Sequence, residues 1–165
     1  MGFTATGIST STVTTTQQAP LGFVLTVPNG NFGNQEWVYV KVTGSAVVEG
    51  DVCMVGADKA KPYEVVITPA STAAQKNVKL IGAAQGSIAE NSYGFLLQRG
   101  KGKVQCGAVV AAGAALMTDT GNGGADLGQV ITLTDVAAVG NCACGIALVA
   151  GADAAASDCF VTFGG

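Results

Sequence analysis

Apolar and polar residues alternate along much of the chain with the two-residue period of a β-strand. In residues 36–42 one face of the predicted strand carries three valines, and the other face carries Trp37 and Tyr39. Residues 21–27 form a second short apolar run, and a cluster of Pro, Asn and Gly separates the two. We expect a β-hairpin over residues 21–43, with the valine face in the core.

The aromatic face of that hairpin allows two interpretations. Trp37 and Tyr39 either lie buried beneath the N-terminal segment or the hairpin, or they form a platform on which a sugar or a base stacks. The chain has a single Trp and three Tyr, which is too few for a broad aromatic binding surface. Burial is the favoured interpretation.

Short apolar runs continue to the C-terminus, separated by glycine turns or small polar loops. They predict strands at 52–55, 64–68, 78–84 and 94–98, and again at 114–118, 129–133, 142–149 and 157–163. Two Ala-containing connections, 69–77 and 134–141, are compatible with one helical turn each. Many short strands at this spacing predict an all-β chain that folds as a small antiparallel β-barrel or sandwich.

The second half of the chain repeats the first. Residues 107–117 align with 44–54 at a spacing of 63, with two glycines and one methionine at matching positions. Residues 131–132 align with 67–68 at a spacing of 64, and the spacing then returns to 63. Two units are too few for a solenoid, which needs about three or more. We therefore expect one closed body made of two related halves.

These alignments divide the chain. We expect a first unit at 44–100 and a second unit at 104–165, and we interpret the basic stretch 99–103 as the linker between them. Together with the 21–43 hairpin, the two units form a single β domain, 21–165. This length is sufficient for the domain to bury a core of its own.

Residues 1–20 differ in composition from the rest. Thr and Ser dominate this segment, and Phe3, Ile8 and Val13 are isolated apolar positions within it. Such a composition cannot build a core, so we expect an extended arm that becomes ordered against a neighbouring surface.

Composition narrows the range of partners. Charged residues make up 12% of the chain, about half the usual share of roughly 25%, and apolar residues make up 48%. A surface with so few charges is typical of subunits that pack against neighbours.

The net charge of −3 with eight basic residues gives no electrostatic footprint for nucleic acid. The longest apolar run, 104–117, is shorter than the ~20 residues of a membrane helix, and the first residues lack the pattern of a signal peptide. We expect neither a nucleic-acid nor a membrane partner.

Candidate chemistry is sparse. The chain has no histidine, so a Ser or Cys nucleophile lacks its usual base. Acidic residues such as Glu49 and Asp51 lie beside glycine turns, where a solvated carboxylate is a better interpretation than a catalytic pair. The loop 119–126 lacks the alternating carboxylates and the final Glu of an EF-hand. We expect no catalytic residue, no cofactor and no metal, and hence no enzyme.

The five cysteines are odd in number and include no C-x-x-C pair. Cys142 and Cys144 share one face of a predicted strand and could bind a soft metal. Without histidine, however, a zinc site would need four thiolates from scattered positions. We favour small buried side chains in a reducing compartment.

Three segments carry a resemblance to a known family. They are the pattern V-x-G-x-x-V-x-x-G-D that begins at Val42, the Gly- and Ala-rich run 106–117, and the ending 144–152 followed by the alternating residues 160–163. In these segments the chain resembles the small capsid decoration, or cement, proteins of tailed bacteriophages, although its arm is longer and its charges are fewer. The resemblance implies a β-barrel without catalytic residues that trimerises on the outer surface of the phage head and braces the major capsid protein.

From these observations we expect a structural virion protein, made in the host cytoplasm, that binds the outer surface of an assembled capsid and stabilises it. Its partners would be the major capsid protein and further copies of itself, with a trimer as the expected form. The residues expected to contact a partner are Phe3, Ile8, Val13, Trp37 and Tyr39. Two alternatives stay open: a carbohydrate-binding fibre or adhesin module that uses Trp37, Tyr39 and the loop 29–34, and, more distantly, a hydrolase with converging carboxylates.

Overall fold

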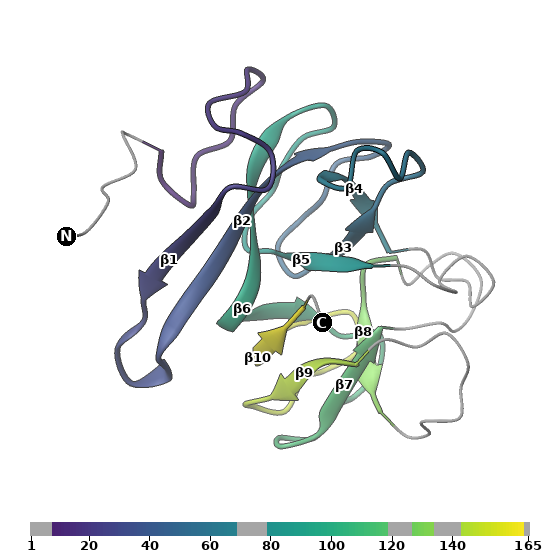
Figure 1. Ribbon diagram of the computed structural model, residues 1–165. Helices are drawn as coiled ribbons and strands as arrows, with labels where there is room; N and C mark the ends of the chain where they lie inside the picture. Colours follow the sequence, from purple (N-terminus) through teal and green to yellow (C-terminus); the bar gives the residue numbers. More distant parts are fainter. Residues whose placement is uncertain (1–7, 69–78, 119–126, 134–142, 164–165) are drawn as a thin grey trace.

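The computed structural model describes residues 8–68, 79–118, 127–133 and 143–163, and this part of the chain is all-β, as predicted (Figure 1). The predicted connections 69–77 and 134–141 lie outside the described residues. The elements are β1 (Val24–Pro28), a 3₁₀ turn η1 (Gly30–Phe32), β2 (Asn34–Val42), β3 (Val52–Val55), β4 (Glu64–Ile67), β5 (Leu80–Ala84), β6 (Tyr93–Gln105), β7 (Ala115–Thr118), β8 (Val130–Thr132), β9 (Ala143–Ala147) and β10 (Ala156–Thr162).

The ten strands form one connected sheet in the order β1-β2-β4-β3-β5-β6-β10-β9-β7-β8. An additional antiparallel pairing joins β2 to β6, so the pairings β2–β4–β3–β5–β6 return to their start. Among the paired strands, only β2 and β4 run parallel. Five strands of the first half therefore form a closed ring of pairings.

A second ring follows, and it shares β6 with the first. The first part of β6 pairs with β2, and its second part, from Arg99 to Gln105, pairs with β10. The pairings continue through β9, β7 and β8, and a parallel bridge between Cys106 and Val130 closes the ring. The backbone N–H of Gly107 also donates to the Val130 carbonyl at 2.9 Å.

The sequence predicted that the stretch 99–103 is a linker, and this prediction is wrong. The stretch lies inside β6, the longest of the described strands. Its two glycines bend β6 from one ring into the next. Gly100 has φ +115°, a conformation that L residues rarely adopt. Gly102 leaves room for the side chain of Leu97, which a Cβ at this position would meet.

The pairing geometry confirms that the two halves are related. In the first ring β3 pairs with β5 at Cys53↔Gly82, and one unit later β7 pairs with β9 at Leu116↔Gly145. Both pairs are followed by a bulge at the same step, so even this irregularity recurs. All of these positions correspond at the predicted spacing of 63.

The spacing predicted for the middle block was wrong by one residue. Met54 pairs with Val66 and Met117 pairs with Ile131, so Ile131 corresponds to Val66 at a spacing of 65 instead of 64. The Ile-Thr pairs of the two halves match in sequence but occupy different register positions. A slip of one residue moves a side chain to the opposite face of a strand.

Two apolar cores follow from the two rings. The first fills the first ring and includes the three valines of β2, which confirms the predicted core face. The second joins the interior of the second ring to the outer face of the first. The first-ring core consists of Val38, Val40, Val42, Val47, Cys53, Val55, Val65, Ile81, Ala84, Ile88 and Leu96.

Candidate partner-binding surface

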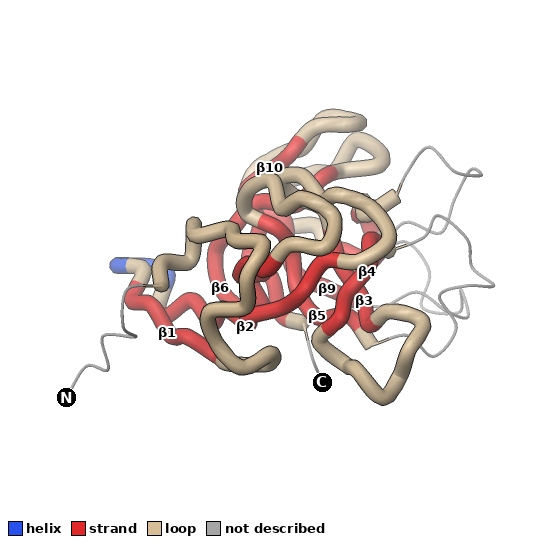
Figure 2. The backbone as a smooth tube through the Cα atoms, turned by 90° about the horizontal axis from the view of Figure 1, so that it is seen from above, coloured by secondary structure: helices blue, strands red, loops and turns tan. Residues whose placement is uncertain are grey.

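The described part of the N-terminal arm, residues 8–20, lies against its own β domain (Figure 2). Thr14 exchanges two backbone hydrogen bonds with Tyr93, with N···O distances of 3.0 and 2.8 Å. The backbone N–H of Gln18 donates to the hydroxyl oxygen of Tyr39 at 3.1 Å. In this structure the chain itself holds the arm.

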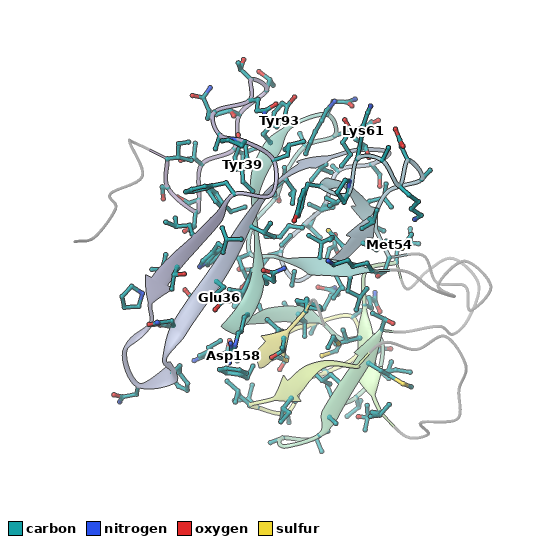
Figure 3. All side chains as sticks on the ribbon, in the orientation of Figure 1. Glu36, Tyr39, Met54, Lys61, Tyr93 and Asp158 are labelled. Carbon is teal, nitrogen blue, oxygen red and sulfur yellow. The ribbon has the colours of Figure 1, made fainter. Side chains whose placement is uncertain are left out.

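The two aromatic side chains that sequence analysis singled out lie beneath this arm and the hairpin. Trp37 is 8% exposed and Tyr39 is 1% exposed. Tyr39 stacks on Tyr93 with ring centroids 6.2 Å apart (Figure 3). The ring centroid of Phe95 lies 5.1 Å from that of Tyr39. Burial, the favoured interpretation, is confirmed. Neither ring is open to a partner or a sugar while the arm holds this position.

The other predicted contact residues are placed differently. Val13 is 43% exposed, and Ile8 is partly buried against the second core. Phe3 lies outside the described residues. Among the five predicted contact residues, Val13 is thus the one that the described structure presents to solvent.

A pocket of about 200 Å³ separates part of the arm from the first ring. Val13 of the arm and Trp37, Ile88 and Phe95 of the first ring contribute apolar surface to it, and hydroxyl and amide side chains and Gly86 complete its lining. No charged residue lines it. The indole N–H of Trp37 is buried without a hydrogen-bond partner among the described residues. The arm therefore leaves space between itself and the first ring.

The basic residues of β6 are paired within the chain. The Nζ of Lys101 lies 3.0 Å from the Asp158 carboxylate, and the Nζ of Lys103 lies 3.2 Å from that of Glu49. Arg99 is 3.9 Å from Glu36. These pairs are partly or largely exposed and stabilise the fold little. They do, however, neutralise the one basic cluster in the sequence.

The described cysteines are buried side chains of the cores. Burial raises the pKa of the Cys53 and Cys106 thiols, and burial together with nearby Cys106 and Asp158 raises that of Cys159 to about 12. Such thiols stay protonated at neutral pH and are poor nucleophiles and metal ligands. Cys142 and the loop 119–126 lie outside the described residues. The part of the chain that the structure describes contains no cluster of acidic, Cys and His side chains suited to a metal.

Asp51 is a buried carboxyl at the contact between the two halves. Its Oδ2 accepts a hydrogen bond from the Val48 N–H at 2.7 Å. Gly128 of the second half packs against it, and the Gly128 carbonyl accepts from the Val52 N–H at 2.7 Å. Burial raises the pKa of Asp51, and the hydrogen bond from Val48 opposes this only in part.

Asp51→Asn is expected to remove a pH dependence of stability. The raised folded-state pKa means that the folded protein binds more protons than the unfolded chain between the ordinary aspartate pKa of about 3.9 and the raised value. Wild-type stability should therefore fall as the pH rises through that window. Asparagine still accepts the Val48 hydrogen bond but does not ionise, so thermal unfolding from about pH 3.5 to pH 7 should show a smaller fall. Superimposable profiles for the two proteins would contradict this prediction.

The amino-acid sequence matches no protein-family model and no curated protein. Within the described residues, no helix has the length and apolar character needed to cross a membrane.

Sequence analysis did not single out one group of surface residues. It predicted 142–149 as a strand, yet Ile146, Leu148 and Val149 all present substantial apolar surface to solvent. For Ile146 the signal is the repeat itself, because position 146 corresponds to a buried position, Ala83, one unit earlier.

Proposed function

We propose that the protein is a structural virion protein that binds the outer surface of an assembled phage capsid and stabilises it, without catalysis. The observation that carries this proposal is an arm, residues 8–20, that makes a turn at 9–12 and is attached to a closed two-ring body by few polar contacts. An arm that is held weakly on its own domain can exchange that site for one on a neighbouring subunit. The resemblance to phage decoration proteins implies a protein that braces neighbouring major capsid subunits, and an arm that reaches a neighbour would add a contact of its own.

The stabilisation would follow from mass action. A ligand that binds only the assembled shell shifts the equilibrium against disassembly by RT ln(1 + [L]/Kd) for each site. Many copies of a modest binder therefore stabilise a shell without any chemical step. The partners are the major capsid protein and further copies of this chain, with a trimer as the expected oligomer.

Cosedimentation with capsids tests the proposal. Purified protein is mixed with DNA-free capsids of the phage that encodes the chain, and with its unassembled capsid protein as the control. We expect saturable binding to the capsids alone, and a higher capsid disruption temperature in its presence. Absence of binding, or binding without any change in disruption temperature, would overturn the proposal.

The carbohydrate-binding alternative loses its main support, because the rings of Trp37 and Tyr39 are covered.

A further inference from the structure

The strands β6 and β10 begin at corresponding positions of the two halves. Tyr93 is the first residue of β6, and Ala156, 63 residues later, is the first residue of β10. Shortly before each strand the chain makes an isolated antiparallel bridge to an earlier turn, and these bridges correspond as well. They are Val47↔Ile88 in the first half and Val110↔Gly151 in the second. Each bridge draws the chain away from the strand that follows, so the edge beside its first residue is left open.

In the first half the N-terminal arm fills this edge. Thr14 exchanges two backbone hydrogen bonds with Tyr93, as a neighbouring strand would. Gln85 and Gly86, which come directly after β5, line the pocket between the arm and the first ring. The first half therefore shows what this position binds, namely a segment that continues the sheet through a backbone pair.

In the second half the same edge is unfilled among the described residues. Ala156 is the cross-strand neighbour of Gln105 on β6, but the Gln105 N–H donates to the Gly50 carbonyl instead. The Phe163 N–H donates to the Gln98 carbonyl, and bonded and non-bonded pairs alternate along an antiparallel ladder. This phase makes the pair at Ale156 a non-bonded one. The N–H and C=O of Ala156 point away from β6, and no described residue bonds to either.

Two apolar side chains, Leu148 and Val149, lie beside this open edge. The Leu148 N–H donates to the Asp158 carbonyl at 2.9 Å, and the Val149 carbonyl accepts from the Ser157 hydroxyl at 3.4 Å. The two residues are 37% and 48% exposed, and they correspond to the Gln and Gly that lie beneath the arm in the first half. Exposed apolar surface next to an unpaired strand edge favours the addition of a further strand.

The charges near the edge indicate which segment fits. Between residues 143 and 157 the only charged side chain is Asp153, and it is exposed. Acidic side chains on an added segment would be repelled there, and basic ones would be attracted. The arm of the same chain is held at Tyr93, and Figure 1 shows the arm at the top and β9 and β10 in the lower half. The segment must therefore come from another molecule.

We propose that the edge at Ala156 binds an extended segment of a partner protein. The segment is predominantly apolar and has no acidic residues; it pairs its backbone with Ala156 and packs on Leu148 and Val149. The inference rests on the proposed function in one respect, which is that the major capsid protein would be the source of the segment.

A synthetic strand tests the edge without a capsid. The peptide KTVTVTK is added to the ¹⁵N-labelled full chain at roughly 0.1 to 5 mM, the range in which a single short strand binds. We expect the amide resonances of residues 148–149 and 156–158 to shift, and those of β1, the strand at the end of the sheet, to stay unchanged. ETVTVTE should bind about twofold to fivefold more weakly, because its glutamates meet Asp153. A wild type without shifts at 148–158 overturns the inference.

Ala156→Pro removes the N–H that the added strand needs. This N–H has no partner in the free chain, and proline is tolerated at the first residue of a strand, so the variant should fold. We expect it to bind KTVTVTK at least about tenfold more weakly than the wild type. Ala156→Thr is the matched control, since it keeps the N–H and suits a strand, and it should bind as the wild type does. Equal binding by Ala156→Pro and the wild type contradicts the inference.

The same variants identify the source of the segment. In cosedimentation with DNA-free capsids, Ala156→Pro should bind about threefold or more weakly than Ala156→Thr. Equal capsid binding by the two variants would overturn the assignment of the segment to the capsid protein. Absence of capsid binding with peptide binding intact would count against the capsid proposal alone. Self-association of the wild type that Ala156→Pro abolishes would assign the edge to the arm of another copy and overturn the choice of partner.

Discussion

Deletion of residues 2–20 is expected to weaken binding to assembled capsids by about tenfold or more, the equivalent of roughly 1.4 kcal/mol, while the remaining domain still folds. The proposed function places the arm on a neighbouring subunit, so its loss removes that contact. The domain should survive because both rings close within residues 34–163 and each has its own core. Cosedimentation measures the binding, and far-ultraviolet circular dichroism measures the fold.

A full-length control separates release of the arm from loss of the arm. Thr14→Pro removes the N–H that donates to the Tyr93 carbonyl, so it loosens the arm from its own domain without shortening it. If the arm binds a neighbour, this variant should bind capsids at least as well as the wild type. Trp37, the single Trp, lines the pocket beneath the arm, so its fluorescence should shift to the red in both variants. A truncated protein that binds as tightly as the wild type contradicts the role of the arm.

Gly50→Ala should destabilise the fold strongly, by about 3 kcal/mol or more. Gly50 has φ +93°, and a Cβ there would stand 2.7 Å from the backbone nitrogen of Gln105 and 3.0 Å from the carbonyl carbon of Val104. The Gln105 N–H also donates to the Gly50 carbonyl at 2.9 Å, so the two backbones cannot move apart without losing this bond. The midpoint of urea unfolding measures the loss.

The repeat supplies the matched control for this substitution. Gly113 is the counterpart of Gly50, with φ +81°, and no atom lies within 4 Å of the position of its Cβ. Gly113→Ala should therefore carry only the backbone strain, about 1 to 2 kcal/mol. Equal losses in the two variants would mean that the contact between the halves at Gly50 contributes nothing to stability.

The features that sequence predicted best are those that depend on local pattern. The alternation in 36–42 placed the valines of β2 in the core, because a strand turns successive side chains to opposite faces. The recurring turn glycines revealed the duplication, since they occupy the same turn in both halves. Gly50 and Gly113, for instance, both have positive φ. These signals need no knowledge of which strands pair.

The features that sequence missed depend on pairing between distant segments. The register of Ile131 follows its pairing with Met117, and the matching Ile-Thr letters of the two halves gave a position one residue away. The stretch 99–103 has the glycines and charges of a linker, yet β10 pairs along its whole length and β2 pairs with the residues before it, which makes it a strand. Composition does not encode these neighbours.

The candidate surface was predictable only in part. The two interpretations of Trp37 and Tyr39 differ in where the arm lies, and no local pattern decides that. The exposure of Ile146 is also hidden in the sequence, because an apolar residue in a strand is usually an inward one. It becomes visible when the same position is compared between the two rings.

The continuous course of β6 through both rings has a mechanical consequence. The pairings follow β6 to β2 up to Arg99 and to β10 from Arg99 onward, so the halves cannot rotate against each other without breaking backbone hydrogen bonds to β2 or to β10. A force applied to one half is therefore transmitted to the other through the backbone hydrogen bonds of β6, which share the load. Under force the molecule should behave as one rigid body and unfold in one step, since β6 is a strand of both rings and neither ring can lose it alone.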